Sequence, residues 1–327
     1  MGEHLASILA NEHNVWVTSR SVHKNSEKIK YICGDAHDIL FLKNTLLDQH
    51  WDSIIDFMLY KTEEFIKHIE LILAATKQYI FLSSSRVYAS SNKLLTEESD
   101  RLLDVCTDND YLATDEYALA KAKQEDYLRN IGNMNFTIVR PYITYSESRL
   151  QLGPLEKENW LYRVLTGKPI IFAKDLLNKY TTLTYGYDVS NTISYLIGNK
   201  TSLGQIFNIT AKDSYTWQEI LDFYLDIIEK KTGIRPIVCY IDSFININFY
   251  SNSAQIKYDR LFDRKFDSSK LRNINCNIEF CDTFIGLEKC LNTFLNNPTF
   301  LNVNQQIQIE FDNLSDYEFN SSQIYYH

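Results

Sequence analysis

The sequence contains no run of about eighteen apolar residues, so no membrane-spanning helix is expected. Its first residues, MGEHLASILANEHNVWV, have no basic segment followed by an apolar run, which argues against a signal peptide. The cysteines show neither metal-ligand nor disulfide spacing, even in the stretch CNIEFC, and stand at Cys33, Cys106, Cys239, Cys276, Cys281 and Cys290. These absences predict a cytoplasmic protein with free thiols and no metal site.

Basic charge is also scarce. Lys and Arg number 33 against 42 Asp and Glu, a formal net charge of -9, which argues against nucleic acid as the main partner. An anionic substrate stays open, since local Arg and Lys can still form a pocket. The 327 residues are 45% hydrophobic, which is enough for the core of one large α/β domain or of two lobes.

The first half of the chain alternates between apolar strands and amphipathic helices. Strands are predicted over 15–19, 30–33, 53–59, 79–85 and 135–143. Helices are predicted over 3–11, 38–49, 62–77 and, after a long polar loop, 114–132. Strands that alternate with helices over short loops predict an α/β fold with a parallel, doubly wound sheet.

The pattern loosens after residue 145. Helices are predicted over 156–166, 188–198, 216–231 and 283–296, and short strands over 169–173, 205–210 and 236–240. We therefore expect a dinucleotide-binding domain over 1–145, a smaller substrate lobe over 146–299 that is interleaved with the sheet, and a loosely packed tail over 300–327.

The chain opens at a helix, whereas a doubly wound dinucleotide domain begins with a strand and a glycine turn. Gly2 stands where the last glycine of a G-x-x-G-x-x-G turn would be, and the strand and the two earlier glycines are absent. In such a fold this turn holds the cofactor pyrophosphate at the helix N-terminus. The sequence thus predicts an N-terminally incomplete cofactor domain.

Tyr117 and Lys121 form a Y-x-x-x-K pair, whose spacing places both side chains on one helical face. A free tyrosine titrates near pH 10. Bringing its pKa to about 7 requires about 4 kcal/mol of stabilisation of the phenolate, which a lysine ammonium and an oxidised nicotinamide can supply. Tyr117 would then exchange a proton with a substrate hydroxyl or carbonyl, to which Ser84 on the preceding strand donates a hydrogen bond.

Five segments, in order along the chain, resemble the landmarks of the extended short-chain dehydrogenase/reductase superfamily, with its nucleotide-sugar epimerases, dehydratases and reductases. They are FLSSSRVY (81–88), Tyr117 with Lys121, TIVRP (137–141), LTYGYDVS (183–190) and GQIFNIT (204–210). The resemblance runs over about residues 2–272. It implies a Rossmann-type fold and a catalytic Ser three residues before Val87, which is Ser84.

The resemblance also places a nicotinamide cofactor. Asp35, after Gly34, matches the carboxylate that meets the adenine, and Arg140 matches the strand end beside the nicotinamide. Phe57 and Met58 stand where the family has small residues against the cofactor, which puts the shape of this pocket in doubt.

The end of the second predicted strand bears on the choice of cofactor. NAD enzymes place an acidic residue there, whereas this chain has Ser19 and Arg20. A hydroxyl and an arginine suit a 2′-phosphate, so NADP is favoured and NAD is the alternative.

Several residues are candidates for contact with the substrate. Arg149, Lys157, Trp160 and Arg163 follow the fifth strand, where relatives bind the nucleotide diphosphate and base, and either Arg260 or Arg264 matches the arginine that reaches the diphosphate. Ser85 and Arg86, directly after Ser84, are further candidates. Relatives that remove water, the 4,6-dehydratases, carry an Asp-Glu pair at the positions of Ser85 and Arg86. Dehydration is therefore disfavoured.

Two enzymatic readings remain. Ser19 and Arg20 favour reduction of a 4-keto-6-deoxy sugar nucleotide, because NADP usually serves net reductive biosynthesis, and a nucleotide-sugar 4-epimerase with bound NAD is the alternative. A non-catalytic binding or regulatory protein on the same fold is a third reading. A homodimer is also expected, because relatives pair through the tyrosine helix and the helix over 62–77, whose stripe Phe65, Ile69 and Ile72 fits such a contact.

Overall fold

Four parallel strands form the centre of the molecule, in the order β12-β5-β4-β3. They are β3 (Ile54–Asp56), β4 (Tyr79–Leu82), β5 (Phe136–Pro141) and β12 (Gln205–Ile209). Every residue of β4 and β5 is buried, as expected for strands covered on both faces. The computed structural model describes all residues except 48, 246, 248–252, 275–277 and 316–327, so Cys276 lies outside the described residues.

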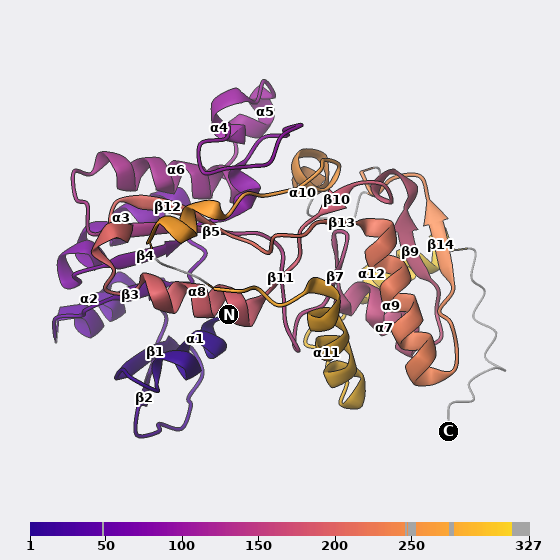
Figure 1. Cartoon of the computed structure of the whole chain (residues 1–327), viewed down its shortest axis with the longest axis horizontal. Helices are drawn as coiled ribbons and strands as arrows, with labels where there is room; N and C mark the ends of the chain where they lie inside the picture. The colour runs from indigo at the N-terminus through magenta and orange to yellow at the C-terminus, as the bar shows by residue number, and fades with distance from the viewer. Residues whose placement is uncertain (48, 246, 248–252, 275–277, 316–327) are drawn as a thin grey trace.

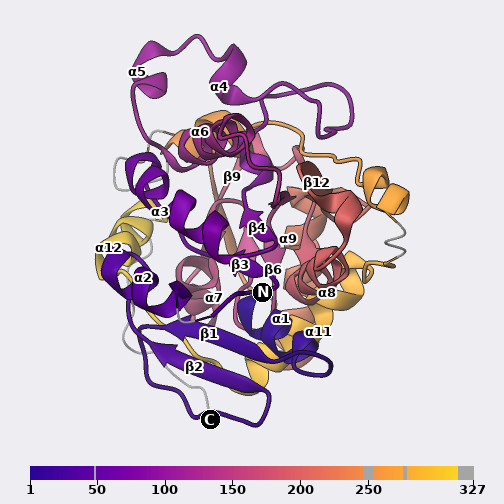
Figure 2. The same ribbon diagram turned by 90° about the vertical axis from the view of Figure 1, so that its left-hand side faces the viewer.

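Helices cover both faces of this sheet (Figure 2). One face carries α2 (Ile39–Leu47), α3 (Thr62–Ala75) and α6 (Tyr117–Asn130), and the other carries α1 (Gly2–Leu9) and α8 (Gly186–Leu196). Side chains alternate in direction along β4. Tyr79 and Phe81 therefore pack in the apolar cluster beneath α2, α3 and α6, and Ile80 and Leu82 pack in the one beneath α1 and α8. The predicted doubly wound α/β fold is confirmed.

The strands of the first half do not all enter one sheet. β1 (Val15–Ser19) and β2 (Ile29–Cys33) pair in parallel with each other alone, at the lower left of Figure 1. Leu5 and Leu9 of α1 belong to the same apolar cluster as Val15 of β1 and Ile55 of β3. Helix α1 is therefore held between the small sheet and the central one.

The second half builds a separate apolar core, on the right of Figure 1. Its elements are the parallel strands β9 (Ile170–Ala173) and β14 (Val238–Ile241) and the helices α7 (Lys157–Leu165), α9 (Trp217–Thr232), α11 (Thr283–Asn296) and α12 (Gln305–Leu314). Trp160 and Trp217 are completely buried there. Between β9 and α9 the chain returns to the first part, where it forms α8 and β12, so the two parts are interleaved.

The expected loosely packed tail is wrong for the part that the structure describes. Gln305–Leu314 form helix α12, and Phe311 on it is completely buried in the second core. Asp312 also receives a hydrogen bond from the buried Arg163, at 2.9 Å. Residues 316–327 lie outside the described residues.

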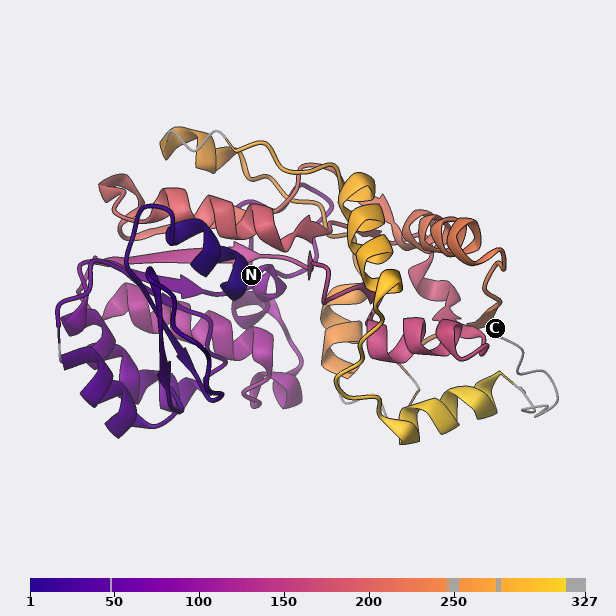
Figure 3. The ribbon, with the colours of Figure 1, turned by 90° about the horizontal axis from the view of Figure 1, so that it is seen from below.

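The remaining elements are short. They are β6 (Thr144–Tyr145), β7 (Gln151–Leu152), β8 (Leu155–Glu156), β10 (Tyr180–Thr181), β11 (Thr184–Tyr185), β13 (Tyr215–Thr216), α4 (Leu102–Val105), α5 (Asn109–Leu112), α10 (Ser253–Gln255), the 3-10 helices η1 (Ser85–Val87), η2 (Lys174–Leu176), η3 (Lys200–Ser202) and η5 (Ser269–Ile274), and the π-helix η4 (Ile256–Arg260). The start of α1 lies at the junction of the two parts in both Figure 1 and Figure 3. Across the described residues, no helix has the length and apolarity needed to cross a membrane.

The stripe on α3 that suited a dimer contact faces the interior. Phe65 and Ile69 are 0% exposed and Ile72 is 3% exposed, and all three pack in the cluster that includes Tyr79 and Phe81 of the sheet. The stripe therefore packs against the central sheet of its own chain, and it gives no support to a homodimer.

A buried ion pair joins α6 to the ends of the central strands. The Arg140 guanidinium on β5 donates to the Glu125 carboxylate on α6 through Nε, at 2.9 Å, and through Nη2, at 2.5 Å. The Ser83 hydroxyl after β4 donates to the same carboxylate, and the Tyr88 hydroxyl accepts from Arg140 at 2.8 Å. Glu125 is 0% exposed, so these donors replace the water that it has lost.

Removing one partner of this pair leaves a buried charge without compensation. We expect Arg140→Met to lower the free energy of unfolding by about 3–5 kcal/mol in urea denaturation. The control is Lys77→Met, whose Nζ lies 2.7 Å from Asp52 on the surface and whose loss should change the free energy by at most about 1 kcal/mol. Equal effects of the two substitutions would contradict a structural role of the Arg140–Glu125 pair.

Candidate active site

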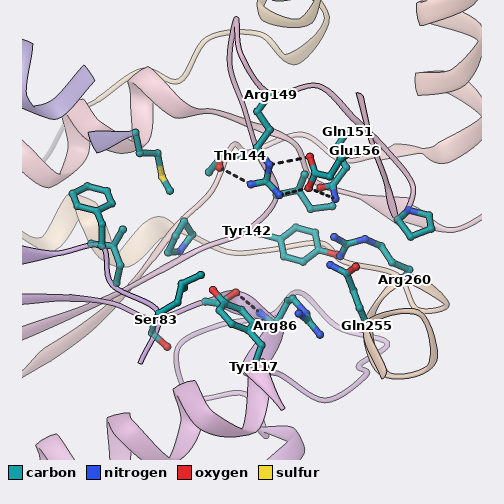
Figure 4. Close-up of a pocket in the computed structure, with 18 of the residues that line it drawn as sticks. Ser83, Arg86, Tyr117, Tyr142, Thr144, Arg149, Gln151, Glu156, Gln255 and Arg260 are labelled. Atoms are coloured by element: carbon teal, nitrogen blue, oxygen red, sulfur yellow. Dashed lines mark hydrogen bonds and ion pairs between the residues drawn. The ribbon is translucent and has the colours of Figure 1, made fainter. Parts of the chain in front are cut away.

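A cavity of about 570 Å³ opens at the carboxyl ends of the central strands. Its walls include Phe57–Leu59 after β3, Leu82–Ser84 at the end of β4 and Pro141–Thr144 at the end of β5. Segments of the second part, among them Arg149 and Arg260, close the other side (Figure 4). Ligands of parallel α/β sheets bind at this edge, so the cavity is the candidate active site.

Tyr117 and Ser84 meet at this cavity. Tyr117 is the first residue of α6, and it lines the cavity together with Ser84, the residue that precedes η1. Burial raises the pKa of Tyr117, while the nearby Ser84 hydroxyl and the Arg86 and Arg149 cations act in the opposite direction. The two hydroxyls can hold one substrate oxygen between them.

Lys121 lies one helical turn after Tyr117 and is almost completely buried. Its Nζ donates to the Met58 carbonyl at 3.3 Å and lies 4.5 Å from the centre of the Phe81 ring. Burial lowers the pKa of Lys121 to about 8, and the carboxylates of Asp56 and Glu125 oppose this effect. Arg86 and Arg149 also lower the pKa of Tyr117, and the role of Lys121 beside the phenol stays a prediction.

Arg86 stands beside the tyrosine on the cavity wall. Its guanidinium carbon lies 5.2 Å from the centre of the Tyr117 ring, and Nη2 donates to the Glu116 carboxylate at 2.7 Å. Glu116 also accepts from the Tyr111 hydroxyl at 3.0 Å and from the Ala118 amide at 2.8 Å, as the N-cap of α6. This arrangement fixes Arg86 against the start of the catalytic helix.

Two further arginines line the side of the cavity that the second part builds. Arg149 donates to Glu156 at 2.7 Å, and Arg260 donates to the Tyr142 hydroxyl at 3.0 Å and to Asp259. The charged side chains of the lining are therefore Arg86, Arg149, Arg260 and Glu156. A cavity with this excess of cations, in a chain of net charge -9, suits an anionic ligand.

The structure does not place Ser85 and Arg140 in the cavity. The Ser85 hydroxyl is 0% exposed and donates to the Arg140 carbonyl at 2.8 Å. Arg140 points to the helix side of the sheet, where Glu125 holds it. Along a strand successive side chains alternate in direction, so the neighbour of a cavity residue points away from the cavity.

Lys157 and Arg264 are also occupied elsewhere. Lys157 is buried, with its Nζ 3.0 Å from the Thr299 carbonyl and beside the Phe294 and Phe300 rings. Arg264 is 0% exposed, and it pairs with Asp259 at 2.8 Å and donates to backbone carbonyls. Both act as internal supports of the second part and do not contact the cavity.

Trp160 and Arg163 were likewise expected beside the nucleotide. Both are 0% exposed within the second core, and Arg163 pairs with Asp312 of α12. Their helix thus serves packing. Of the positively charged residues that the resemblance singled out, Arg86, Arg149 and Arg260 are the ones that the structure brings to the cavity.

The residues that could hold a nicotinamide cofactor lie at the cavity and at the ends of β1 and β2. Phe57 and Met58 line the cavity, and so does Met1, which precedes the first turn of α1. The first amides of that helix have no acceptor within the helix, and a Cβ at Gly2 would meet no atom within 4 Å, so the space there is open. With Tyr117 and Lys121 at one end, these residues fit a dinucleotide whose phosphates lie against the start of α1.

The ends of β1 and β2 lie outside the cavity. The Ser19 hydroxyl is 3.1 Å from His23 Nε2, and the Arg20 side chain is exposed. Asp35 is exposed, and its carboxylate accepts from the His37 amide at 3.0 Å. Both strand ends are accessible to the adenosine half of a cofactor.

Several lining residues gave no signal in the sequence. Tyr142 and Thr144 continue an apolar strand, and Gln151, Glu156 and Gln255 belong to segments that only the tertiary structure brings together. Tyr142 could have been recognised, because polar groups directly after a buried strand are typical of this sheet edge.

The fold and the site define a Rossmann-type α/β protein with a tyrosine- and serine-based centre at the sheet's carboxyl edge. A family model, that of the NAD-dependent epimerase/dehydratase family, matches residues 1–210. The chain belongs to this family. The predicted relation to the extended short-chain dehydrogenases is confirmed.

A curated relative is the chloroplast stem-loop binding protein of 41 kDa b of Arabidopsis thaliana, 28% identical over 193 residues, or 59% of this chain. The chain spans about half the length of that relative, with 47% covered. Two solved structures share the fold at 16% identity. An epimerase from Methanothermobacter thermautotrophicus has a TM-score of 0.69, with 94% of this chain and 91% of that chain covered. UDP-glucose 4-epimerase from Bifidobacterium longum, in complex with NAD+ and UDP, has a TM-score of 0.66, with 90% and 95% covered.

The low pKa of Lys121 predicts how stability depends on pH. Between about pH 8 and pH 10.5 the folded chain holds fewer protons on Lys121 than the unfolded chain, so this group makes the free energy of unfolding rise with pH. Lys121→Met removes this contribution. We expect the free energy of unfolding of the wild type, minus that of the variant, to grow by about 3 kcal/mol across this window in urea denaturation.

Lys123→Met is the matched control, because it removes a lysine from the more exposed side of the same helix. A wild-type-minus-Lys121→Met difference that stays constant from pH 8 to pH 10.5 would show that Lys121 is not desolvated.

Proposed function

We propose that this chain catalyses hydride transfer between a nicotinamide cofactor and a ring carbon of a nucleotide-linked sugar, with Tyr117 as the acid and base. The observation that carries the proposal is that Tyr117 and Ser84 line one cavity, whose charged side chains are three arginines and one glutamate. The hydroxyls suit an alcohol or a carbonyl, and the arginines suit a diphosphate.

The residues act in defined places. A substrate oxygen lies between Tyr117 and Ser84, where Ser84 donates to it and the Tyr117 hydroxyl takes or returns its proton. Arg149 and Arg260, on the far wall, bind the diphosphate. Lys121, beside Tyr117 and the Met58 carbonyl, would hold the ribose of the cofactor. The bound nicotinamide would supply or accept the hydride.

Two finer reactions fit this scheme. Epimerisation at C4 is supported by the fold shared with UDP-glucose 4-epimerase and by the NAD+ bound in that structure. Reduction of a 4-keto-6-deoxy sugar nucleotide is supported by Ser19 and Arg20, which suit NADP and thus a net reductive reaction. We place epimerisation first, because a 6-deoxy sugar offers only a methyl group where Arg86 faces the cavity.

One assay separates the two reactions. The purified chain is incubated with UDP-glucose and NAD, and separately with a dTDP-4-keto-6-deoxy sugar and NADPH, while the reduced nicotinamide and the sugar products are followed. Interconversion of two sugar nucleotides without net consumption of cofactor supports epimerisation. Stoichiometric oxidation of NADPH supports reduction.

A binding protein on the same fold is the alternative of another class. The relative described as a stem-loop binding protein supports it, whereas the net charge of -9 opposes binding to a phosphate backbone. The Tyr117 hydroxyl distinguishes the two, because a binding protein does not depend on one phenolic proton.

Tyr117→Phe keeps the ring and removes the proton that is transferred. We expect turnover to fall by roughly 10²- to 10⁴-fold, while the dissociation constant for the nucleotide sugar, measured by calorimetry, stays within about threefold. Tyr187→Phe is the control, because this tyrosine is 43% exposed and lies outside the cavity. Full activity in Tyr117→Phe would overturn the proposed function and favour the binding protein.

Arg20 tests the choice of cofactor. Arg20→Asp places a carboxylate where a 2′-phosphate would lie, so we expect the ratio of NADP to NAD affinity to fall by about tenfold or more. Lys28→Asp makes the same change of charge at the opposite end of the β1–β2 pair and should leave the ratio near that of the wild type. An unchanged ratio in Arg20→Asp would remove the support for NADP.

A further inference from the structure

Arg86 lies where the sugar of a bound nucleotide sugar would be. It follows Ser84 by two residues, lines the cavity, and holds its guanidinium carbon 5.2 Å from the centre of the Tyr117 ring. Figure 4 shows it beside Tyr117, away from Arg149. A sugar oxygen that contacts the Tyr117 and Ser84 hydroxyls therefore brings the sugar ring, and not the diphosphate, next to Arg86.

One edge of the Arg86 guanidinium has no acceptor. Nη2 donates to Glu116, whereas Nε is buried and makes no hydrogen bond with any residue that the structure describes. The nearest carboxylate oxygen to Nε, on Asp259, is 4.0 Å away, which is too far for a hydrogen bond. A buried donor without an acceptor is unfavourable, and the Arg86 side chain lines the cavity and is 13% exposed, so a small turn of the guanidinium brings a free donor to a ligand.

The neighbouring carboxylates are already engaged. Asp259 pairs with Arg260 and with Arg264, and Glu116 accepts from the Ala118 amide and from the Tyr111 hydroxyl. Their negative charge is thus shared among several donors, and the positive charge of Arg86 is only partly compensated. A neutral hydroxyl would satisfy the free donor, but it would not compensate this charge.

We propose that Arg86 binds a carboxylate carried by the sugar, so that the substrate is an acidic nucleotide sugar of the uronic acid type. This inference rests on the proposed function and names the substrate class of the same site. A carboxylate supplies a planar pair of acceptors that matches the fork of a guanidinium, and the resulting hydrogen bonds are charge-assisted. In a uronic acid the carboxylate replaces the terminal hydroxymethyl group and is attached to C5. C5 is bonded to C4, the carbon whose oxygen Tyr117 and Ser84 hold.

Calorimetric titration of the full chain, in the presence of NAD, tests the proposal with UDP-glucuronic acid and UDP-glucose. We expect the wild type to bind UDP-glucuronic acid more tightly than UDP-glucose by about tenfold or more. Arg86→Met should reduce this preference by about the same factor, and Arg86→Lys should restore only part of it, because an ammonium lacks the planar fork.

Arg149→Met is the matched control. It removes an arginine from the diphosphate side of the same cavity, so it should weaken both ligands by a similar factor and leave the preference unchanged. Urea denaturation of each variant confirms that the comparison is made between folded proteins.

The possible results distinguish failure of the carboxylate site from failure of the proposed function. Equal affinity of the wild type for the two sugar nucleotides, or a preference that survives Arg86→Met, overturns the carboxylate site and leaves the proposed function standing. Failure of the wild type to bind UDP, UDP-glucose and UDP-glucuronic acid overturns the proposed function, and the inference with it.

Discussion

The carboxylate of Glu125 holds helix α6, which carries Tyr117, against the sheet. It is completely buried, and it accepts from Ser83 at the end of β4 and from Arg140 on β5. Glu125 follows Lys121 by four residues and Tyr117 by eight, so all three lie on one face of α6. Once Glu125 is bound, the helix cannot slide along the sheet, and Tyr117 is fixed beside Ser84. The geometry of the candidate active site therefore depends on this ion pair.

Charge is distributed unevenly in this protein. The chain as a whole is acidic, yet three arginines reach the cavity. Each is held by a different partner: Glu116 for Arg86, Glu156 for Arg149 and Asp259 for Arg260. These partners orient the guanidinium groups without removing them from the cavity wall, which suits recognition of an anion better than flexible surface lysines would.

The pattern of helices and strands could be predicted from the sequence, because apolar periodicity is a local property. The helix predicted over 283–296 matches the structure, and the boundaries of the helices over 62–77 and 156–166 differ by at most two residues at either end. The prediction was wrong where packing decides: residues 305–314 form a packed helix, and β1 and β2 pair apart from the central sheet. Neither outcome can be predicted from a local sequence pattern, since each depends on packing partners that are distant along the chain.

The sequence by itself determined the fold class, the family and the relative placement of Ser84, Tyr117 and Lys121. Ser84 closes a buried strand, and Tyr117 and Lys121 lie one helical turn apart, so their positions follow from local spacing. The tertiary structure decided which positively charged residues face the ligand. Arg140, Lys157 and Arg264 were expected to contact the cofactor or the substrate, as Arg86 was, yet Glu125, the Thr299 carbonyl and Asp259 hold them in the interior. The physical reason is that a buried cation must be paired, and its partner is known only once the chain has folded.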